Sequence, residues 1–374
     1  MKKIFSGFVL LALSLCVFLT SSSTLVYATE ASTQSINSNL ENIYLSDLTN
    51  VKNRPAGSVG EQNMANKLAQ FCTNSGYTYF GDMTSFSQEF DIGKGKSSQN
   101  IIAQKGNASS SYVILGAHYD AVYVDNKSYG YNDNLSGVLA VMETAKILNA
   151  NSNFNIILAF WGAEEVGCLG SEYFVANLPD EVKNNTLLYV NFDTVGAGDY
   201  RYYYTNDFQN HYAKVLDQKF ANAGIKKYSS QIYAPHNTNE INYTSLGLQS
   251  DNASFLKAGI NSLSYFTGNL ETQNGFGYFE TSGQPRIMHT TDSQGKIEEV
   301  FGTEHFAENI AFFAELTSSL LEAGEFTETN FVPNQVSAWL YSDVCLKLIG
   351  VGAVVVGFGI YLIIYFKKYK LNKK

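Results

Sequence analysis

The sequence predicts an α/β protein built around a mixed β-sheet. Between residues 84 and 322, short apolar segments alternate with segments of helical periodicity. Several of the short segments, such as 112–116, are almost continuously apolar, which is typical of strands covered on both faces. The earliest strand-like segments follow one another closely, so an antiparallel edge is expected on a mostly parallel sheet.

Each element is placed by its own pattern. A turn at Arg54–Ser58 precedes a helix at Gly60–Ser75, which has Met64, Leu68 and Phe71 on one face. The strands are expected at Thr84–Asp91, Asn100–Gln104, Tyr112–Ala117, Asn155–Phe160, Leu187–Phe192 and Asn261–Phe266. The later helices are expected at Leu135–Leu148, Ser171–Ala176, Asp207–Ala223, Asp251–Ala258 and Gly302–Glu322.

The first segment, residues 1–28, has the pattern of a secretory signal peptide. Lys2 and Lys3 precede the uncharged run Ile4–Thr20, and small residues at Val26 and Ala28 form a cleavage site. An uncleaved N-terminal anchor is the alternative interpretation.

The last segment predicts a single membrane span. Leu348–Phe366 is an uncharged apolar run, close to the roughly 20 residues that cross a bilayer. A lysine-rich tail, residues 367–374, follows it and is expected to stay in the cytoplasm. We therefore expect a single-pass protein of the cell membrane with an extracellular body and a polar tether at 326–347. A buried core helix is the alternative for the apolar run.

Composition narrows the classes of partner. The net charge is −9, and it becomes more negative when the lysines of the two ends are set aside, which disfavours nucleic acid as a partner. Hydrophobic residues make up 45% of the chain, enough for a substantial core. Cys72 and Cys168 are the two cysteines of the body, and we do not expect them to form a disulfide.

Polar clusters occur where strands of the predicted sheet end or helices begin. In open α/β sheets, ligands bind beyond the carboxyl ends of the strands. Taken singly, a histidine there is usually structural, an aspartate at a helix start is usually an N-cap, and adjacent glutamates usually form a solvated turn. The clusters are His118-Tyr119-Asp120, Asp133 to Gly137, Gly162 to Glu165, Asp193 to Gly196, and His289 to Asp292.

Together, the clusters predict a metal site. Carboxylates gathered at one sheet edge repel one another unless a cation neutralises them. Two histidines and three carboxylates suit zinc, which accepts nitrogen and oxygen ligands. Five ligands serve two ions only if one carboxylate bridges the pair. The residues alone therefore indicate a metal-dependent hydrolase.

The order and spacing of the five clusters resemble the M28 family of zinc aminopeptidases, over about residues 54 to 322. The segment Ser250 to Ile260 also resembles the helix that follows a Ser-Asp pair in that family. The resemblance implies a zinc exopeptidase-like three-layer α/β/α sandwich within residues 30–325. It also implies peptide substrates and two zinc ions per chain.

The resemblance assigns roles by position. It implies that Asp133 bridges the two zinc ions, that His118 and Asp193 complete one site, and that Glu165 and His289 complete the other. Glu164 would be the general base that takes a proton from the attacking water. Asp120 would orient the imidazole ring of His118, and Asp292 would orient that of His289 in the same way.

One position departs from the family pattern. Some members have a tyrosine directly before the last histidine ligand, where it stabilises the oxyanion, whereas Met288 cannot donate a hydrogen bond. The other histidines, His211, His236 and His305, are interpreted as structural.

Other functions stay open at this point. A glutaminyl cyclase shares the His-x-Asp and paired acidic residues but usually has a tryptophan in place of Met288. A catalytically inactive binding ectodomain and a carboxypeptidase are further alternatives. Substrate preference is not readable from the expected pocket walls, which are Tyr200–Tyr204, Ser229–Leu246 and Asn269–Arg286. Oligomeric state is not readable either.

Overall fold

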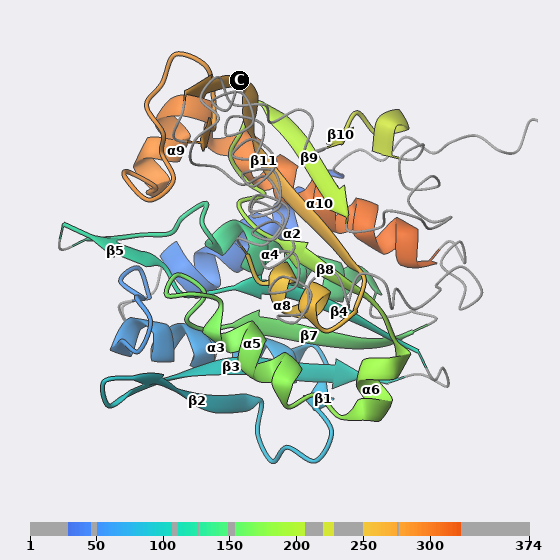
Figure 1. The fold of residues 1–374 in the computed structure, drawn as a ribbon. Coiled ribbons are helices and arrows are strands. Elements are labelled where there is room, and N and C mark those ends of the chain that lie inside the picture. The colour runs from blue at the N-terminus through green and yellow to red at the C-terminus, as the bar shows by residue number, and fades with distance from the viewer. Residues whose placement is uncertain are drawn as a thin grey trace, which may run out of the picture.

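A mixed β-sheet forms the centre of the fold (Figure 1). The computed structural model describes residues 29–45, 51–106, 111–125, 127–148, 154–205, 220–227, 250–274 and 277–322. In these residues the main sheet has the order β1-β3-β7-β4-β8-β11-β9-β10, with β2 paired to β3 and β12 paired to β11. The strands are β1 (Thr78–Tyr79), β2 (Ser87–Gly93), β3 (Lys96–Lys105), β4 (Tyr112–His118), β7 (Asn155–Trp161), β8 (Thr186–Phe192), β9 (Tyr200–Thr205), β10 (Lys226–Lys227), β11 (Ser262–Asn274) and β12 (Gly277–Phe279).

Parallel pairing is concentrated in the centre of the sheet. Strands β7, β4, β8 and β11 run parallel to one another, whereas β3 is antiparallel to β7 and β9 is antiparallel to β11. The expected antiparallel edge is present, and a second antiparallel flank lies on the other side. The expectation of a mostly parallel sheet therefore holds for the centre, and the short edge pair β9–β10 is also parallel. The short β2–β3 connection permits only a hairpin, because parallel neighbours need a long crossover.

Helices cover both faces of the sheet, as the sandwich prediction requires. Helices α2, α4 and α10 pack against one another, and α4 packs on β4 and β8, while α5 and α8 pack together on the opposite face. The helices are α2 (Glu30–Leu40), the π-helix η1 (Glu41–Leu45), α3 (Val59–Asn74), α4 (Leu135–Ile147), α5 (Leu169–Ala176), α6 (Asp180–Asn185), α8 (Asn252–Lys257), α9 (Gln294–Phe301) and α10 (Thr303–Glu322).

The apolar strands divide their side chains between two cores. In β4, Val113 and Leu115 join the larger core under α3, α4 and α10, while Ile114 joins the smaller core under α5 and α8. In β7, Leu158 and Ala159 separate in the same way. Successive side chains of a strand point to opposite faces, so a continuously apolar strand supplies both cores.

The predicted strands and most predicted helices appear close to their expected bounds, except that β11 extends eight residues beyond the expected end at Phe266. Sequence patterns missed α2, α6, α9, the strands β1, β9, β10 and β12, and a separate hairpin formed by β5 (Val122–Val124) and β6 (Lys127–Tyr129). Helix α9 has a local cue, because the Ser293 hydroxyl accepts the Lys296 backbone N–H as an N-cap. Most of the helix expected at 207–223 lies outside the described residues.

The two predicted membrane-related segments also lie outside the described residues. They are the signal peptide at 1–28 and the span at 348–366, with its tether and tail. Among the described helices, none is both long enough and apolar enough to cross a bilayer.

Candidate metal centre

The five predicted ligands come from loops at one edge of the sheet. His118 ends β4, Glu165 follows β7, and Asp193 follows β8 directly. Asp133 precedes α4, and His289 lies in the loop before α9. Since the central strands are parallel, their carboxyl ends meet at this edge, which is where open α/β sheets bind ligands.

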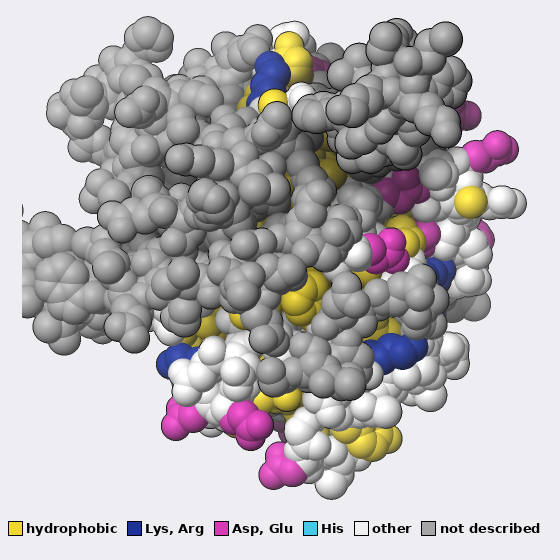
Figure 2. All heavy atoms as spheres, turned by 90° about the vertical axis from the view of Figure 1, so that its right-hand side faces the viewer, with side chains coloured by type: hydrophobic (Ala, Val, Ile, Leu, Met, Phe, Trp, Pro, Cys, Tyr) yellow, Lys and Arg dark blue, Asp and Glu magenta, His cyan; other side chains and the backbone are white. Residues whose placement is uncertain are grey.

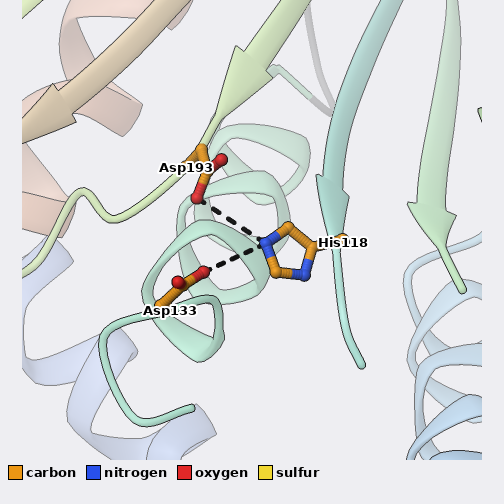
Figure 3. A group of neighbouring side chains, drawn as sticks. All are labelled: His118, Asp133 and Asp193. Atoms are coloured by element: carbon orange, nitrogen blue, oxygen red, sulfur yellow. Dashed lines mark ion pairs between the residues drawn. The ribbon is translucent and has the colours of Figure 1, made fainter. Parts of the chain in front are cut away.

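His118 lies between two carboxylates (Figure 3). Its Nε2 atom is 3.1 Å from Asp133 Oδ1 and 3.6 Å from Asp193 Oδ1. The imidazole is buried, and its other nitrogen, Nδ1, lies 3.5 Å from Asp120 Oδ1. One donor atom from each of His118, Asp133 and Asp193 falls within a group less than 4.8 Å across, as a shared metal ion requires.

A second group shares Asp133 with the first. His289 Nε2 lies 2.8 Å from Asp133 Oδ2 and 3.3 Å from Glu165 Oε2. These three residues also offer ligand atoms within 4.8 Å of one another. The two oxygens of Asp133 therefore face different histidines, which is the arrangement that a bridging carboxylate needs.

The pKa shifts of Glu164 and His289 indicate that this cluster of carboxylates and imidazoles attracts cations. Burial raises the pKa of Glu164, and the negative charges of Asp251, Asp193 and Glu165 raise it further against the effect of His118. Burial lowers the pKa of His289, but the Asp133 and Glu165 carboxylates outweigh it and raise the value to about 11. Protons are thus held in the cluster by the same charges that would hold metal ions.

Several buried side-chain atoms that could bind a metal ion also have no hydrogen-bond partner among the described residues. They are Oε1 of Glu165, Oδ1 of Asp193 and both ring nitrogens of His118, whose short contacts with Asp120 and Asp133 do not have hydrogen-bond geometry. Buried polar atoms are nearly always satisfied by a hydrogen bond or by a bound ion. Two neutral imidazoles and three carboxylates are ligands that zinc accepts, so the residues present fit a zinc pair.

Asp120 holds the backbone of the paired glutamates. Its Oδ1 accepts the Glu164 N–H at 3.0 Å, and its Oδ2 accepts the Glu165 N–H at 3.2 Å. Its contact with the His118 imidazole was expected, whereas these two bonds were not. Asp120 consequently couples the loop after β4 to the loop after β7.

Asp292 lies in a different place from the one expected. Its carboxylate accepts the backbone N–H groups of Asn132 and Asp133, at 2.8 Å for the nearer oxygen in each case, instead of contacting the His289 ring. Burial raises the pKa of Asp292 to about 7, despite these two bonds. Asp292 therefore positions the backbone of Asn132 and Asp133.

Arg54 joins the two ends of the loop that separates His118 from Asp133. Its Nε donates to the Tyr119 carbonyl at 2.6 Å, and its Nη2 donates to the Gly130 carbonyl. The side chain is fully buried. Its planar fork of donors suits two fixed carbonyls.

Glu61, in the first turn of α3, contacts the segment before the paired glutamates. Its Oε1 accepts the Ser98 hydroxyl at 2.7 Å and the Ala163 N–H at 3.3 Å. Burial raises the pKa of Glu61 to about 7, with a further contribution from the charge of Asp120. Gly162 is needed here, because a Cβ would come within 2.3 Å of the Ser98 hydroxyl and 2.5 Å of the Gln99 backbone carbonyl.

Asp193 is oriented by a chain of buried hydrogen bonds. The Ser250 hydroxyl donates to Asp193 Oδ2 at 2.8 Å, and Asn191 Nδ2 donates to Ser250 at 2.9 Å. Tyr189 donates to Asn191 at 2.7 Å and accepts from the Trp161 indole at 2.8 Å. Ser250 was noted in the sequence only as part of a Ser-Asp pair, because its contact spans 57 residues of chain.

Left-handed backbone occurs beside three of the predicted site residues. Ala163, Thr194 and His289 have φ values of 56°, 53° and 61°. Non-glycine residues adopt this conformation rarely, and such positions concentrate at functional sites. Ala163 is next to Glu164, the predicted base, and Thr194 is next to Asp193, a predicted ligand. His289 is itself a predicted ligand.

Other predicted residues have clear positions. Cys72 and Cys168 are free thiols, as expected, and Cys168 Sγ lies 3.5 Å from Glu164 Oε1. His305 lies near the Gly198 carbonyl and Asn309, in keeping with a structural role. Of the three segments expected to form the pocket walls, Tyr200–Tyr204 belongs to β9. Residues 229–246 lie outside the residues that the structure describes, and residues 269–286 are described except for 275 and 276. His211 and His236 also lie outside the described residues.

Comparison with known proteins identifies the family. The family model for peptidase family M28 matches residues 100–314, which is more than half of the chain. The chain belongs to peptidase family M28. All five predicted ligands and Glu164 of this M28 chain lie inside the matched region, whereas Arg54 and Glu61 lie before it.

Among named relatives, leucine aminopeptidase 2 of Trichophyton equinum is 41% identical over 103 residues, or 27% of this chain and 20% of the relative. The match thus spans about a fifth of that relative's length. A zinc-dependent exopeptidase structure from Parabacteroides distasonis has a TM-score of 0.55 at 15% identity and covers 80% of this chain and 99% of its own. A glutaminyl cyclase structure from Porphyromonas gingivalis has a TM-score of 0.51 at 17% identity, covering 78% and 99%. At these identities the two structures show a shared fold only.

Proposed function

We propose that this M28 chain is a two-zinc aminopeptidase. The observation that carries the proposal is the placement of Asp133, whose two carboxylate oxygens face His118 and His289 separately. Asp193 would complete the site at His118, and Glu165 the site at His289. When bound, the zinc pair would acidify a water molecule and polarise the scissile carbonyl.

Glu164 is proposed as the general base. It is buried, lies 3.9 Å from His118 Nε2 through Oε2, and is joined through its backbone N–H to Asp120. Burial and neighbouring carboxylates raise its pKa, which suits a group that takes a proton near neutral pH. Glu164 would accept the proton of the attacking water and deliver it to the leaving amine.

The aminopeptidase proposal is supported by family membership and by the names of relatives such as leucine aminopeptidase 2. A glutaminyl cyclase remains the second candidate, since one shares the fold. Met288 favours the peptidase, because cyclases usually have a tryptophan at that position. The Met288 sulfur instead lies 2.9 Å from Arg286 Nη2.

We further propose an extracellular location on a single C-terminal span. The support is the sequence pattern of residues 1–28 and 348–374. Protease treatment of intact cells that carry tags at residue 30 and at the C-terminus tests this topology. The tag at residue 30 should be cleaved, and the C-terminal tag should be protected. Accessibility of the C-terminal tag from outside would contradict it.

The decisive experiment compares zinc content and hydrolysis in the full-length chain. We expect about two zinc ions per chain, release of leucine from leucine anilide, no reaction with the N-acetylated anilide, and loss of activity on chelation. Glu164→Gln should keep the zinc and lose roughly 10²–10⁴-fold in kcat. Glu172→Gln, at an exposed carboxylate paired with Lys257, is the matched control and should react normally.

Each alternative predicts a different result. Pyroglutamate formation from glutaminyl peptides without anilide hydrolysis would indicate the cyclase. Release of C-terminal residues would indicate a carboxypeptidase. A zinc-free chain with no turnover would indicate a binding ectodomain.

A further inference from the structure

A pocket of about 680 Å³ lies between three separate segments of the chain. Lys52, Lys127 and Lys296 line it, together with polar residues, and no acidic side chain among the described residues does. We call it the lysine pocket. In a chain of net charge −9, three lysines that line one pocket give it a locally positive field.

Two contacts orient the lysine side chains. Lys52 Nζ lies 5.3 Å from the centroid of the Tyr44 ring, which holds it by a cation–π interaction. Lys296 Nζ is 3.1 Å from Glu299, a largely exposed carboxylate that does not line the pocket. Such an exposed pair is weak, so Lys296 remains able to bind another anion.

Two further features favour a negatively charged ligand. Ser293, which lines the pocket, is the N-cap of α9, so the positive end of this helix is at the pocket. The hydroxyl oxygen of Ser128, another lining residue, is buried and has no hydrogen-bond partner among the described residues. A hydroxyl and a helix N-terminus both donate hydrogen bonds to anions.

The pocket lies beside the candidate metal centre. Thr291, in its wall, is two residues after His289, so their Cα atoms are at most about 7.6 Å apart. Lys127 and Ser128 belong to β6, in the loop between the ligands His118 and Asp133. Figure 1 shows the β5 hairpin and α9 at the edge to which β7 points.

Charged side chains of both signs occur on another side of the molecule. In Figure 2, which views the right-hand side of Figure 1, the described acidic and basic side chains lie scattered among uncharged ones.

We propose that the lysine pocket binds a carboxylate of the peptide substrate, on the portion that leaves after cleavage. This inference rests on the proposed aminopeptidase function. A peptide whose first residue is at the metal centre extends by about 3.3–3.6 Å per residue, so a carboxylate a few residues downstream reaches the pocket. The site therefore selects peptides with an acidic side chain or a free C-terminus near their amino end.

The kinetic test compares three peptides on the full-length chain: Leu-Ala-Glu-amide, Leu-Ala-Gln-amide, and Leu-Ala-Gln with a free C-terminus. The variant replaces Lys52, Lys127 and Lys296 with glutamine. In this variant, KM should rise about tenfold for the peptide whose carboxylate the pocket binds, because three exposed charge contacts are lost. That peptide is Leu-Ala-Glu-amide if the side-chain carboxylate binds, and Leu-Ala-Gln with a free C-terminus if the terminal carboxylate binds. The neutral peptide and leucine anilide should keep their kcat and KM.

A matched triple variant controls for total charge. It replaces Lys94, Lys96 and Lys183, which are outside the pocket, with glutamine and should leave every KM unchanged. An equal rise in KM for acidic and neutral peptides, or the same rise in the matched variant, would overturn the inference.

Binding to the metal-free chain separates this inference from the proposed function. By calorimetry, the acidic peptide should bind the wild-type chain more tightly than the Lys52/Lys127/Lys296 variant, even if no peptide is hydrolysed. Equal affinity of both chains for the acidic peptide would refute the pocket. Absence of hydrolysis alongside unequal affinity would refute only the enzymatic function.

Discussion

Asp133 is the residue on which both proposed zinc sites depend. Each of its oxygens faces a different histidine, and Asp292 holds its backbone N–H at 2.8 Å. The opposed contacts with His118 and His289 lower the pKa of Asp133 against the effect of its burial. The carboxylate is thus kept ionised and ready to bridge.

Replacement of Asp133 should affect both metals. An asparagine side chain at this position is neutral and has one carbonyl oxygen, so Asp133→Asn should lower zinc content from about two per chain to below one at limiting zinc. Asp193→Asn should retain the ion at Glu165 and His289. Zinc per chain, measured by atomic emission after gel filtration, distinguishes the two variants; two tightly bound ions in Asp133→Asn would be incompatible with a bridge.

Asp120 acts through other residues. Asp120→Asn leaves one of the Glu164 and Glu165 N–H groups facing an amide donor, and it weakens the contact with His118. We expect zinc affinity or kcat to fall about 10–100-fold, the usual effect of changing a residue that orients ligands. Asp91→Asn, at an exposed position of β2 where Asp91 also accepts a backbone N–H, is the control and should change neither.

At the scale of elements, the segment before and at the start of α3 contacts two ligand-bearing loops. Arg54 joins the ends of the 119–130 loop, and Glu61 contacts Ala163 next to the base. Both residues lie before the region that the family model matches. The candidate metal centre is therefore in contact with a segment that contributes none of the predicted ligands.

Arg54→Lys tests this dependence. An ammonium cannot reproduce the fork that reaches both carbonyls, so a buried acceptor is left unsatisfied at a cost of about 1–3 kcal/mol in the free energy of unfolding. Denaturant unfolding should show this loss, and competition with a chelator should show weaker zinc binding. The control, Lys94→Arg in the exposed β2–β3 turn, should change neither the free energy of unfolding nor the zinc affinity. If Arg54→Lys is destabilised but binds zinc normally, Arg54 contributes to folding and not to the metal centre.

At the scale of the whole molecule, buried acids make stability depend on pH and metal. Burial raises the pKa of Glu61, Asp251 and Asp292 to about 7 in each case. Between about pH 4 and 7 the unfolded chain loses these protons first, so the stability of the metal-free fold falls as pH rises. His289, with its pKa raised to about 11, continues the fall above pH 6.5.

Zinc should reverse this trend. The Tm of the metal-free chain is expected to fall by about 5–10 °C between pH 5 and 8, whereas the gain in Tm on adding zinc should increase with pH because the ligands must be deprotonated. Differential scanning fluorimetry with and without a chelator measures both. A metal-free Tm that rises from pH 5 to 8 would show that other groups dominate.

The predicted elements of the fold match the structure where local sequence is sufficient, and the structure brings the predicted ligands together at one sheet edge. Apolar strands such as Tyr112–His118 were recognised because they supply both cores, and the ligand clusters because they follow strand ends. Sequence patterns missed Ser250 as a partner of Asp193, and they misplaced Asp292. Those contacts join residues 57 and 159 positions apart, so no local periodicity reports them.

The sequence by itself determined the alternation of strands and helices, the acidic character and the set of five candidate metal ligands, since each is a property of residue type and spacing. Only the tertiary structure decided that Asp133 faces both histidines and that Arg54 and Glu61 contact the ligand loops. It alone gathered three lysines into one pocket. The physical reason is that buried hydrogen bonds and electrostatic interactions depend on distance in space, which chain folding sets independently of distance in sequence.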